Sequence, residues 1–268
     1  MDGNSSTVGN NISGRTYVGW QWLAGNSTGS SNSNGSITST VSVNQTAGFS
    51  IVSWTGSGAN ATIGHGQSAA PEFIMVKNGD TTNAWTVQSL FLTSADYVLY
   101  LNTSAGEGSD ASAWNSAFAG ATTISIGTDP GTNGSTNNMA FWAWRSIEGY
   151  SSFGSYTGNG SGSYAVDYDG PFIYTGFKPA FVLIKRIDST GNWVIFDDKR
   201  SPINPRALQL HPDLPNVDGA GNDQDFLANG WKVRSNGSAA NATGGTYIYA
   251  AFAENPFGGS GVAQAKAV

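Results

Sequence analysis

The chain has no cysteine, and only 11% of its 268 residues are charged. Without thiols it can form neither a disulfide scaffold nor a thiolate site for zinc or iron–sulfur clusters. Disordered chains are rich in charge and poor in aromatic residues, but aromatic residues here reach 12%. No apolar run approaches the roughly 18–20 residues that a membrane-spanning helix needs, and the N-terminus lacks the pattern of a signal peptide. We therefore expect an ordered chain without membrane insertion.

Basic side chains are also scarce. Twelve Lys and Arg residues stand against eighteen Asp and Glu residues, which gives a formal net charge of −6. Before Arg145 the chain contains only Arg15 and Lys77 as basic residues. Because phosphate binding needs clustered Lys and Arg, nucleic acid is not expected as a partner.

Uncharged turn-forming residues and aromatic residues dominate what is present. Gly, Ser, Asn and Thr together make up more than two-fifths of the chain, and there are nine Trp residues. Short apolar runs at 74–76 and 181–184, bounded by polar residues, predict buried strands. Only 112–115 and 201–209 look helical. The sequence thus predicts an all-β protein with many Gly/Asn/Ser/Thr-rich loops.

The chain also repeats itself. Matching residues lie 108 positions apart in the pairs Pro71 and Pro179, Lys77 and Lys185, and Trp85 and Trp193. An aromatic segment recurs at 139–144, at 247–252 and, as a leading copy, at 17–22. We predict two tandem, related β-sandwich units of jelly-roll type, in which the repeated aromatic residues build two related cores. The expected divisions are a loose segment 1–14, a first unit 15–146 with a leading aromatic strand, a second unit 147–258 and a loose tail 259–268.

Groups suited to catalysis near neutral pH are few. The two histidines are His65, between two glycines, and His211, before a proline. We interpret both as loop residues rather than as catalytic bases or metal ligands. The pair Asp197 and Asp198 ends a strand, so the two side chains should face opposite ways. No P-loop occurs. We predict no catalytic residue, no cofactor and no enzyme activity.

A cation site has weak candidates in three acidic residues of one Gly/Asn-rich loop, which are Asp218, Asp223 and Asp225. Clustered carboxylates can hold Ca²⁺, but these three do not follow the spacing of a known calcium loop. We therefore predict no metal site and retain these residues as candidates only.

Sugar stacking is a further possibility because Trp faces and Asn amides are common in carbohydrate sites. Most Trp residues, such as Trp20 and Trp142, alternate with small residues as core-facing strand positions do. Trp54 and Trp114 lie beside turn-rich sequence instead. They are the candidates for exposed ligand-binding aromatic residues.

Several long segments resemble a domain that is common in phage tail fibre proteins, notably those of marine phages. The resemblance covers roughly residues 16–260 and is carried by the segments 17–25, 46–56, 64–66, 148–160, 176–186, 200–202 and 245–257. It implies a virion structural protein, without catalytic residues to transfer. Residues 67–70 depart from the apolar loop of that pattern. Because Met1 begins almost directly at the domain, we expect a stand-alone virion component.

The first hypothesis is thus a tail fibre or host-adhesion component on the virion surface. Its partners would be other copies of itself, with a trimer favoured, other virion proteins, and a host surface glycan or protein. The alternative is a stand-alone lectin-like carbohydrate-binding module. A glycan depolymerase, which needs two carboxylates about 5–10 Å apart, is the least favoured hypothesis because acidic residues are sparse.

Overall fold

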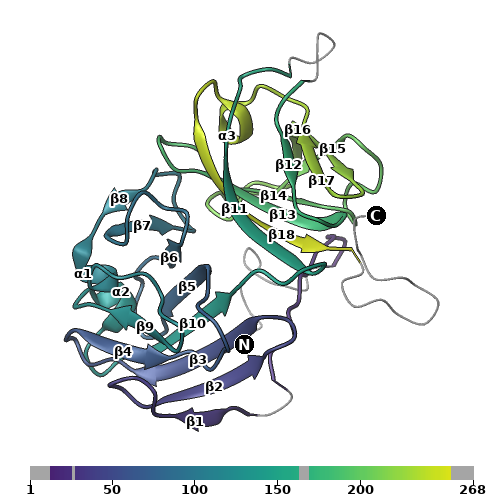
Figure 1. The fold of residues 1–268 in the computed structure, drawn as a ribbon. Coiled ribbons are helices and arrows are strands. Elements are labelled where there is room, and N and C mark those ends of the chain that lie inside the picture. Colours follow the sequence, from purple (N-terminus) through teal and green to yellow (C-terminus); the bar gives the residue numbers. More distant parts are fainter. Residues whose placement is uncertain (1–12, 26–27, 163–168, 255–268) are drawn as a thin grey trace.

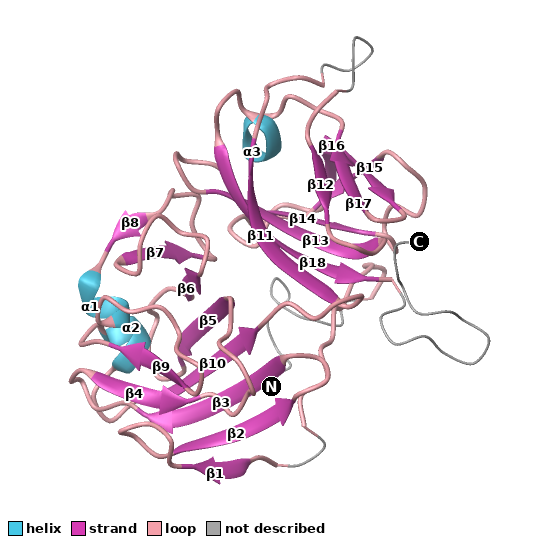
Figure 2. Cartoon of the chain, in the orientation of Figure 1, coloured by secondary structure: helices cyan, strands magenta, loops and turns pink. Residues whose placement is uncertain are grey.

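The computed structural model describes residues 13–25, 28–162 and 169–254, and the loose segments expected at 1–14 and 259–268 lie almost wholly outside this range. Strands dominate it, and helices are limited to single turns (Figures 1 and 2). The predicted all-β class with β-sandwich-like bodies is confirmed. Within the described residues no helix is long and apolar enough to cross a membrane.

Strands β1 to β10 form the first repeat. An antiparallel eight-stranded sheet has the order β1-β2-β3-β10-β5-β6-β7-β8, and β4 pairs with β9 in a small second sheet. The strands of the large sheet, in that order, are β1 (Ser30–Asn32), β2 (Ser39–Asn44), β3 (Phe49–Thr55), β10 (Asn138–Trp144), β5 (Phe73–Asn78), β6 (Thr86–Ser89), β7 (Tyr97–Tyr100) and β8 (Gly108–Ser109). The small sheet and the helices are β4 (Ala61–Gly64), β9 (Thr123–Ile126), α1 (Ala111–Trp114) and α2 (Pro130–Asn133).

Strands β11 to β18 form the second repeat. Two antiparallel four-stranded sheets have the orders β11-β18-β13-β14 and β12-β17-β16-β15. The first contains β11 (Ser151–Thr157), β18 (Thr246–Ala253), β13 (Pro179–Arg186) and β14 (Val194–Asp197). The second contains β12 (Phe172–Tyr174), β17 (Gly230–Val233), β16 (Gly219–Leu227) and β15 (Arg206–Gln209), and α3 (Ser238–Asn241) precedes β18.

The repeat seen in the sequence is a structural repeat. β3 and β11 begin 102 positions apart and make the same pairing, β3 with β10 and β11 with β18. Helices α2 and α3 begin 108 positions apart. Each ends in a fully buried asparagine, Asn133 or Asn241. This pair of asparagines had no place in the sequence prediction.

Asn133 holds a turn and a loop of the first repeat together. Its Oδ1 accepts the backbone N–H of Ser57 at 2.9 Å. Its Nδ2 donates to the carbonyls of Ala59 at 2.7 Å and Gly127 at 3.0 Å. One buried amide therefore satisfies backbone groups from segments that lie far apart in the chain.

Asn241 makes the corresponding contacts in the second repeat. Its Oδ1 accepts the N–H of Asn159 at 2.9 Å, and its Nδ2 donates to the carbonyls of Ser161 and Ser235. The three partners stand at the positions that match Ser57, Ala59 and Gly127 of the first repeat. The repetition of these contacts shows that the two repeats lock their loops in the same way.

The aromatic residues build three cores, not the two that the sequence predicted. One lies inside the first repeat, with Phe141 and Trp114, and one inside the second, with Trp231 and Tyr247. The third lies between the repeats, where Trp144 and other first-repeat residues share one cluster with second-repeat residues. The central strands β10 and β18 alternate between two cores; both faces of β18 are buried, whereas the second face of β10 is only half-buried at Ala140 and Trp142.

Two local predictions are wrong. The segment 17–22 is extended but belongs to no strand, and it packs into the core between the repeats. Of the two predicted helical pieces, 112–115 overlaps α1, whereas 201–209 contains a loop followed by β15. Pro202 and Pro205 explain the second failure, because a proline lacks the N–H that a helix interior needs.

Candidate functional site

Trp54 and Trp114 do not offer faces for sugar stacking. Trp54 is 5% exposed and Trp114 is fully buried, and both belong to the core of the first repeat. Trp54 shares the inward face of β3 with Val52, since alternate strand residues point to one side. The expectation that these two residues are exposed is therefore wrong.

The three acidic candidates for a cation site have different surroundings, and two of them pair with different arginines. Asp218 lies 3.7 Å from the Arg200 guanidinium, and Asp225 lies 2.6 Å from that of Arg234. Burial and the nearby Asp225 carboxylate raise the pKa of Asp223. In the part of the chain that the structure describes, no three acidic or histidine side chains are placed to hold a metal ion.

Both histidines bond to the backbone. The His65 ring is fully buried; Nδ1 accepts the N–H of Gln67 at 3.1 Å, and Nε2 lies 3.2 Å from the carbonyl of Gly120. Burial lowers the pKa of His65, although the bond to Gly120 acts in the opposite direction. Nδ1 of His211 lies 2.7 Å from the carbonyl of Trp193. The observed contacts of both rings are structural.

The most distinctive site is the core between the repeats. The half-buried Trp22 packs against it, with ring centroids 6.0 Å from Trp144 of the first repeat and 5.6 and 5.1 Å from Phe181 and Phe252 of the second. Phe73 of β5 stacks on Phe153 of β11 at 5.9 Å, which joins the two sheets directly. The leading aromatic segment is thus a wedge between the repeats.

This core is not completely filled. A cavity of about 210 Å³, partly open to solvent, remains beside Trp20 and Trp22, and every atom that faces it is apolar. Its walls come from both repeats and include Trp144, Leu183 and Ala250. An apolar space of this size at the junction of two repeats is the strongest candidate for a binding site.

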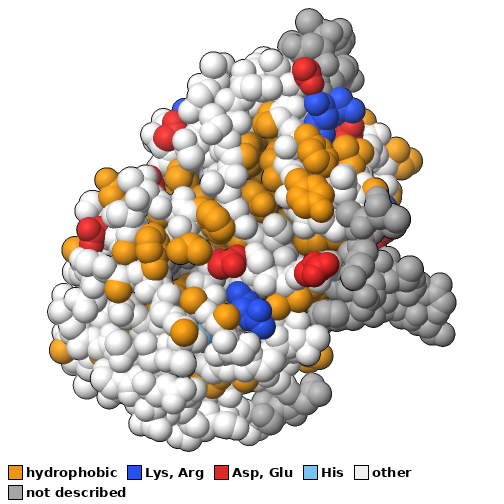
Figure 3. All heavy atoms as spheres, in the orientation of Figure 1, with side chains coloured by type: hydrophobic (Ala, Val, Ile, Leu, Met, Phe, Trp, Pro, Cys, Tyr) orange, Lys and Arg blue, Asp and Glu red, His pale blue; other side chains and the backbone are white. Residues whose placement is uncertain are grey.

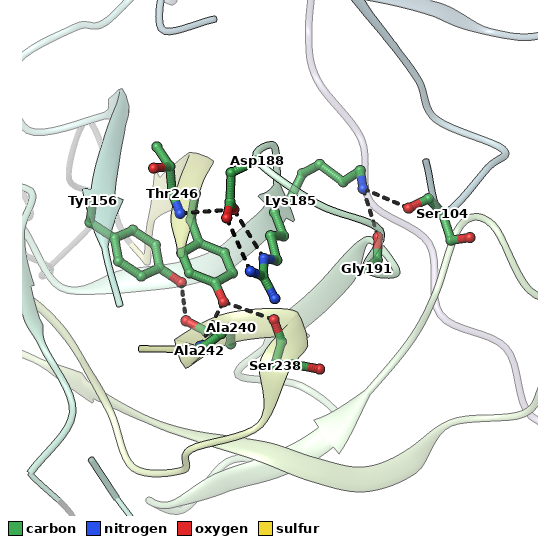
Figure 4. Close-up of polar contacts among 11 residues, drawn as sticks. Ser104, Tyr156, Lys185, Asp188, Gly191, Ser238, Ala240, Ala242 and Thr246 are labelled. Atoms are coloured by element: carbon green, nitrogen blue, oxygen red, sulfur yellow. Dashed lines mark hydrogen bonds and ion pairs between the residues drawn. The ribbon is translucent and has the colours of Figure 1, made fainter. Parts of the chain in front are cut away.

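A polar contact joins the repeats beside this core. Lys185 of β13 is fully buried, and its Nζ donates to the carbonyl of Gly191 at 2.6 Å and to that of Ser104, in the first repeat, at 3.1 Å (Figure 4). The indole N–H of Trp193 donates to the carbonyl of Tyr100 at 2.9 Å. Burial lowers the pKa of Lys185 to about 8, while the nearby Asp213 carboxylate acts in the opposite direction.

The same region holds α3 in place. Tyr156 and Tyr247 stack with ring centroids 4.9 Å apart, and their hydroxyls donate to the carbonyls of Ala240 and Ser238 (Figure 4). Burial raises the pKa of both phenols, so they remain neutral donors at physiological pH. Next to them the Arg186 guanidinium makes two bonds of 3.0 Å to Asp188.

Sequence reasoning missed this site because it lies between the units that the repeat divides. One signal was present. Aligning the two copies places Ala250 at the position that Trp142 occupies in the first repeat. Because alanine is much smaller than tryptophan, the second copy has less side-chain volume at this position.

Fold and site together define a two-repeat, all-β protein whose halves share an aromatic core. Comparison with known families adds one finding. A family described as a domain of unknown function, DUF7483, matches residues 1–256, and the chain belongs to it. Neither a curated protein nor a solved structure matches the chain.

Proposed function

We propose that this chain is a structural and adhesive component of a phage virion, part of a tail fibre or host-adhesion device. In this role it presents its loops to a glycan or protein on the host surface. The observation that carries the proposal is the shared core between the repeats, which makes two β bodies into one unit. A part that transmits force between particle and host needs such a rigid body.

The outer surface agrees with this role. Charged side chains are sparse on the face that Figure 3 shows, and uncharged polar and backbone atoms cover most of the lower, first repeat. Loops rich in Gly, Asn, Ser and Thr supply hydroxyl and amide groups that form hydrogen bonds without strong charge selectivity. Weak contacts of this kind become useful when a particle displays several copies of the chain. A homo-oligomer, with a trimer favoured, belongs to the same proposal.

A shallow polar groove favours a second candidate function, a lectin-like module. Its volume is about 290 Å³, and its lining includes the side chains of Ser31, Thr40, Ser53 and Asn138. Hydroxyl and amide groups of this kind bind sugar hydroxyls. The groove lacks an exposed aromatic face, because Trp54 beside it is 5% exposed. Sugar binding in this groove would therefore depend on hydrogen bonds rather than on aromatic stacking.

Immunogold labelling of intact particles tests the virion role. An antibody against the purified chain should label the tail or its fibres on virions of the phage that encodes it. Gold confined to disrupted particles, or present only in the unassembled fraction of the lysate, contradicts the proposal.

Competition tests the adhesive role separately. Added pure chain should slow adsorption of the phage to its host, and Ser53→Lys, which fills the polar groove with a charged chain, should compete less well if the groove is used. Serine to lysine at Ser155, the exposed matching position of the second repeat, is the control. Unchanged adsorption at saturating pure chain contradicts the adhesive role.

A further inference from the structure

The cavity between the repeats lies where the second repeat has a smaller residue than the first. Trp142 of β10 packs against Trp85, with ring centroids 5.2 Å apart. The matching residue of β18 is Ala250, which is 3% exposed and faces the cavity. The missing indole leaves the space open, so the void follows from one identifiable difference between the copies.

The lining selects the chemistry of an occupant. All atoms that face the 210 Å³ space are apolar, and its lining includes the indole rings of three tryptophans together with Phe181 and Leu183. A charged or hydrogen-bonding group would lose its hydration there without gaining a partner. For comparison, an enclosed apolar cavity of about 150 Å³ binds benzene. The space therefore fits a hydrocarbon group somewhat larger than benzene.

Part of the wall of the cavity is formed by a segment outside the β-sheets. Trp20 and Trp22 lie on the segment 16–25, which belongs to no strand. The side chains of Asn44 and Ser42 bond to its carbonyls at Leu23 and Gly25, beyond the two indoles. A segment held by side-chain packing rather than by a β ladder opens at a lower free energy than the sheets beneath it.

On the far side of these indoles lies a second hollow, which has polar groups. Trp20 and Trp22 line both spaces, and the outer one also has Asp198 and Lys199 on its wall. The Lys199 side chain is 78% exposed. A ligand with a hydrocarbon end and a polar end thus meets an apolar space inside and a polar, solvated one outside.

We propose that the cavity binds the hydrocarbon end of an acyl chain, with Trp20 and Trp22 closing over it. The acyl chain can come from a free fatty acid or from a membrane lipid, and the chemistry at the cavity is the same for both. This inference goes beyond the virion role and does not depend on it.

Tryptophan fluorescence tests the proposal directly, because Trp20, Trp22 and Trp144 line the space. A fatty acid brominated near its methyl end should quench the emission of the whole protein in a saturable way. An unbrominated fatty acid of equal length should reverse the quenching by competition. Absence of saturable quenching overturns the proposal.

Filling the space provides the matched variant. Ala250→Phe should weaken binding of the brominated fatty acid at least tenfold and leave the midpoint of thermal unfolding equal or higher. Val217→Phe, which adds a phenyl ring at a position that is 86% exposed, should bind like the wild type. If Ala250→Phe fails to fold, Leu183→Phe fills the space from the neighbouring strand β13, where Leu183 pairs with Ala250. Equal affinity in a folded, filled variant overturns the proposal.

The source of the acyl chain is decided by a second pair of probes. Free brominated fatty acid is used below its micelle concentration, and the comparison is a phosphatidylcholine vesicle with brominated acyl chains. Quenching by vesicles, abolished in Ala250→Phe, supports the cavity and assigns a lipid as the source. Quenching by the free fatty acid alone supports the cavity and assigns a soluble ligand.

Discussion

The two repeats share the hydrogen bonds of their buried asparagines and differ in the strands at the edges of their sheets. In both, a buried asparagine at the end of a four-residue helix bonds to the matching turn and loop. In the first, β2 covers the outer edge of β3; in the second, β11 is the edge of its sheet. The two repeats thus share the contacts that hold each fold and differ in what covers the edge of the matching strands β3 and β11.

The largest predicted difference concerns the strand edges. Gly56 N–H bonds toward β10 and Gly158 N–H bonds toward β18, so by alternation Ser53 N–H points to β2 and Ser155 N–H points away from the sheet. Ser53→Pro removes a ladder bond in a central strand and should lower the free energy of unfolding by more than about 3 kcal/mol. Ser155→Pro should lower it by less than about 1 kcal/mol.

Urea denaturation of the two variants measures this difference, with Ser53→Ala and Ser155→Ala as controls for the lost side chains. Equal destabilisation by the two prolines would show that the β11 edge is paired in solution. That outcome would end the distinction between a covered and an open edge.

We expect the buried asparagines Asn133 and Asn241 to contribute equally to the stability of the two repeats. Asn133→Ala and Asn241→Ala each leave several buried backbone groups without partners, and each should lower the free energy of unfolding by about 3 kcal/mol. Because the repeats share a core, we expect one cooperative transition in both variants. Calorimetry that resolves two transitions, with only one shifted, would show that the repeats unfold independently.

Much of the fold follows from patterns visible in the sequence. The short apolar runs became β5 and β13, and the copies align because the same residues pack in both. The segment 17–22 misled the prediction, since an aromatic wedge and a half-buried strand have the same alternation. Helices α2 and α3 gave no signal, because four residues are too few to show a helical period.

The candidate site was less predictable. Burial of Trp54 and Trp114 depends on which strand face meets the core, and nearby turn residues do not report that. The cavity depends on how two copies meet, which is a tertiary fact. Only the exchange of Trp142 for Ala250 hinted at it, and the meaning of that exchange needs the packing of β18 against Trp22.

The matching lysines give a prediction about pH. Lys185 reaches across to the first repeat, whereas Lys77 bonds to Asn83 and Thr81 of its own repeat. The folded-state pKa of Lys185, about 8, lies below its ordinary value of 10.5, so above pH 8 the unfolded chain binds more protons than the folded one. The free energy of unfolding should therefore rise with pH, by no more than about 2 kcal/mol between pH 8 and 9.5.

Urea titrations at these two pH values check the prediction. Lys185→Met should abolish the rise, and Lys77→Met should retain it. The other charged groups that face Lys185 are Asp213 and Arg186, and both are present in the two variants. A rise that survives in Lys185→Met would assign the pH dependence to another group.

The smallest expected effect is a loss of stability at acid pH that the buried histidine of the first repeat causes. The first repeat buries His65, and burial lowers the pKa of this ring from its ordinary value of 6.5. The unfolded chain therefore takes up a proton that the folded chain resists, and the free energy of unfolding should fall as the pH drops below 6.5. His65→Gln should remove this acid-dependent loss because an amide does not titrate in this range. The variant keeps a donor for the carbonyl of Gly120, so its stability at pH 8 provides the reference. The difference between wild type and variant should shrink as the pH falls from 8 to 5.5, and a constant difference would show that His65 is not a titrating weak point of the first repeat.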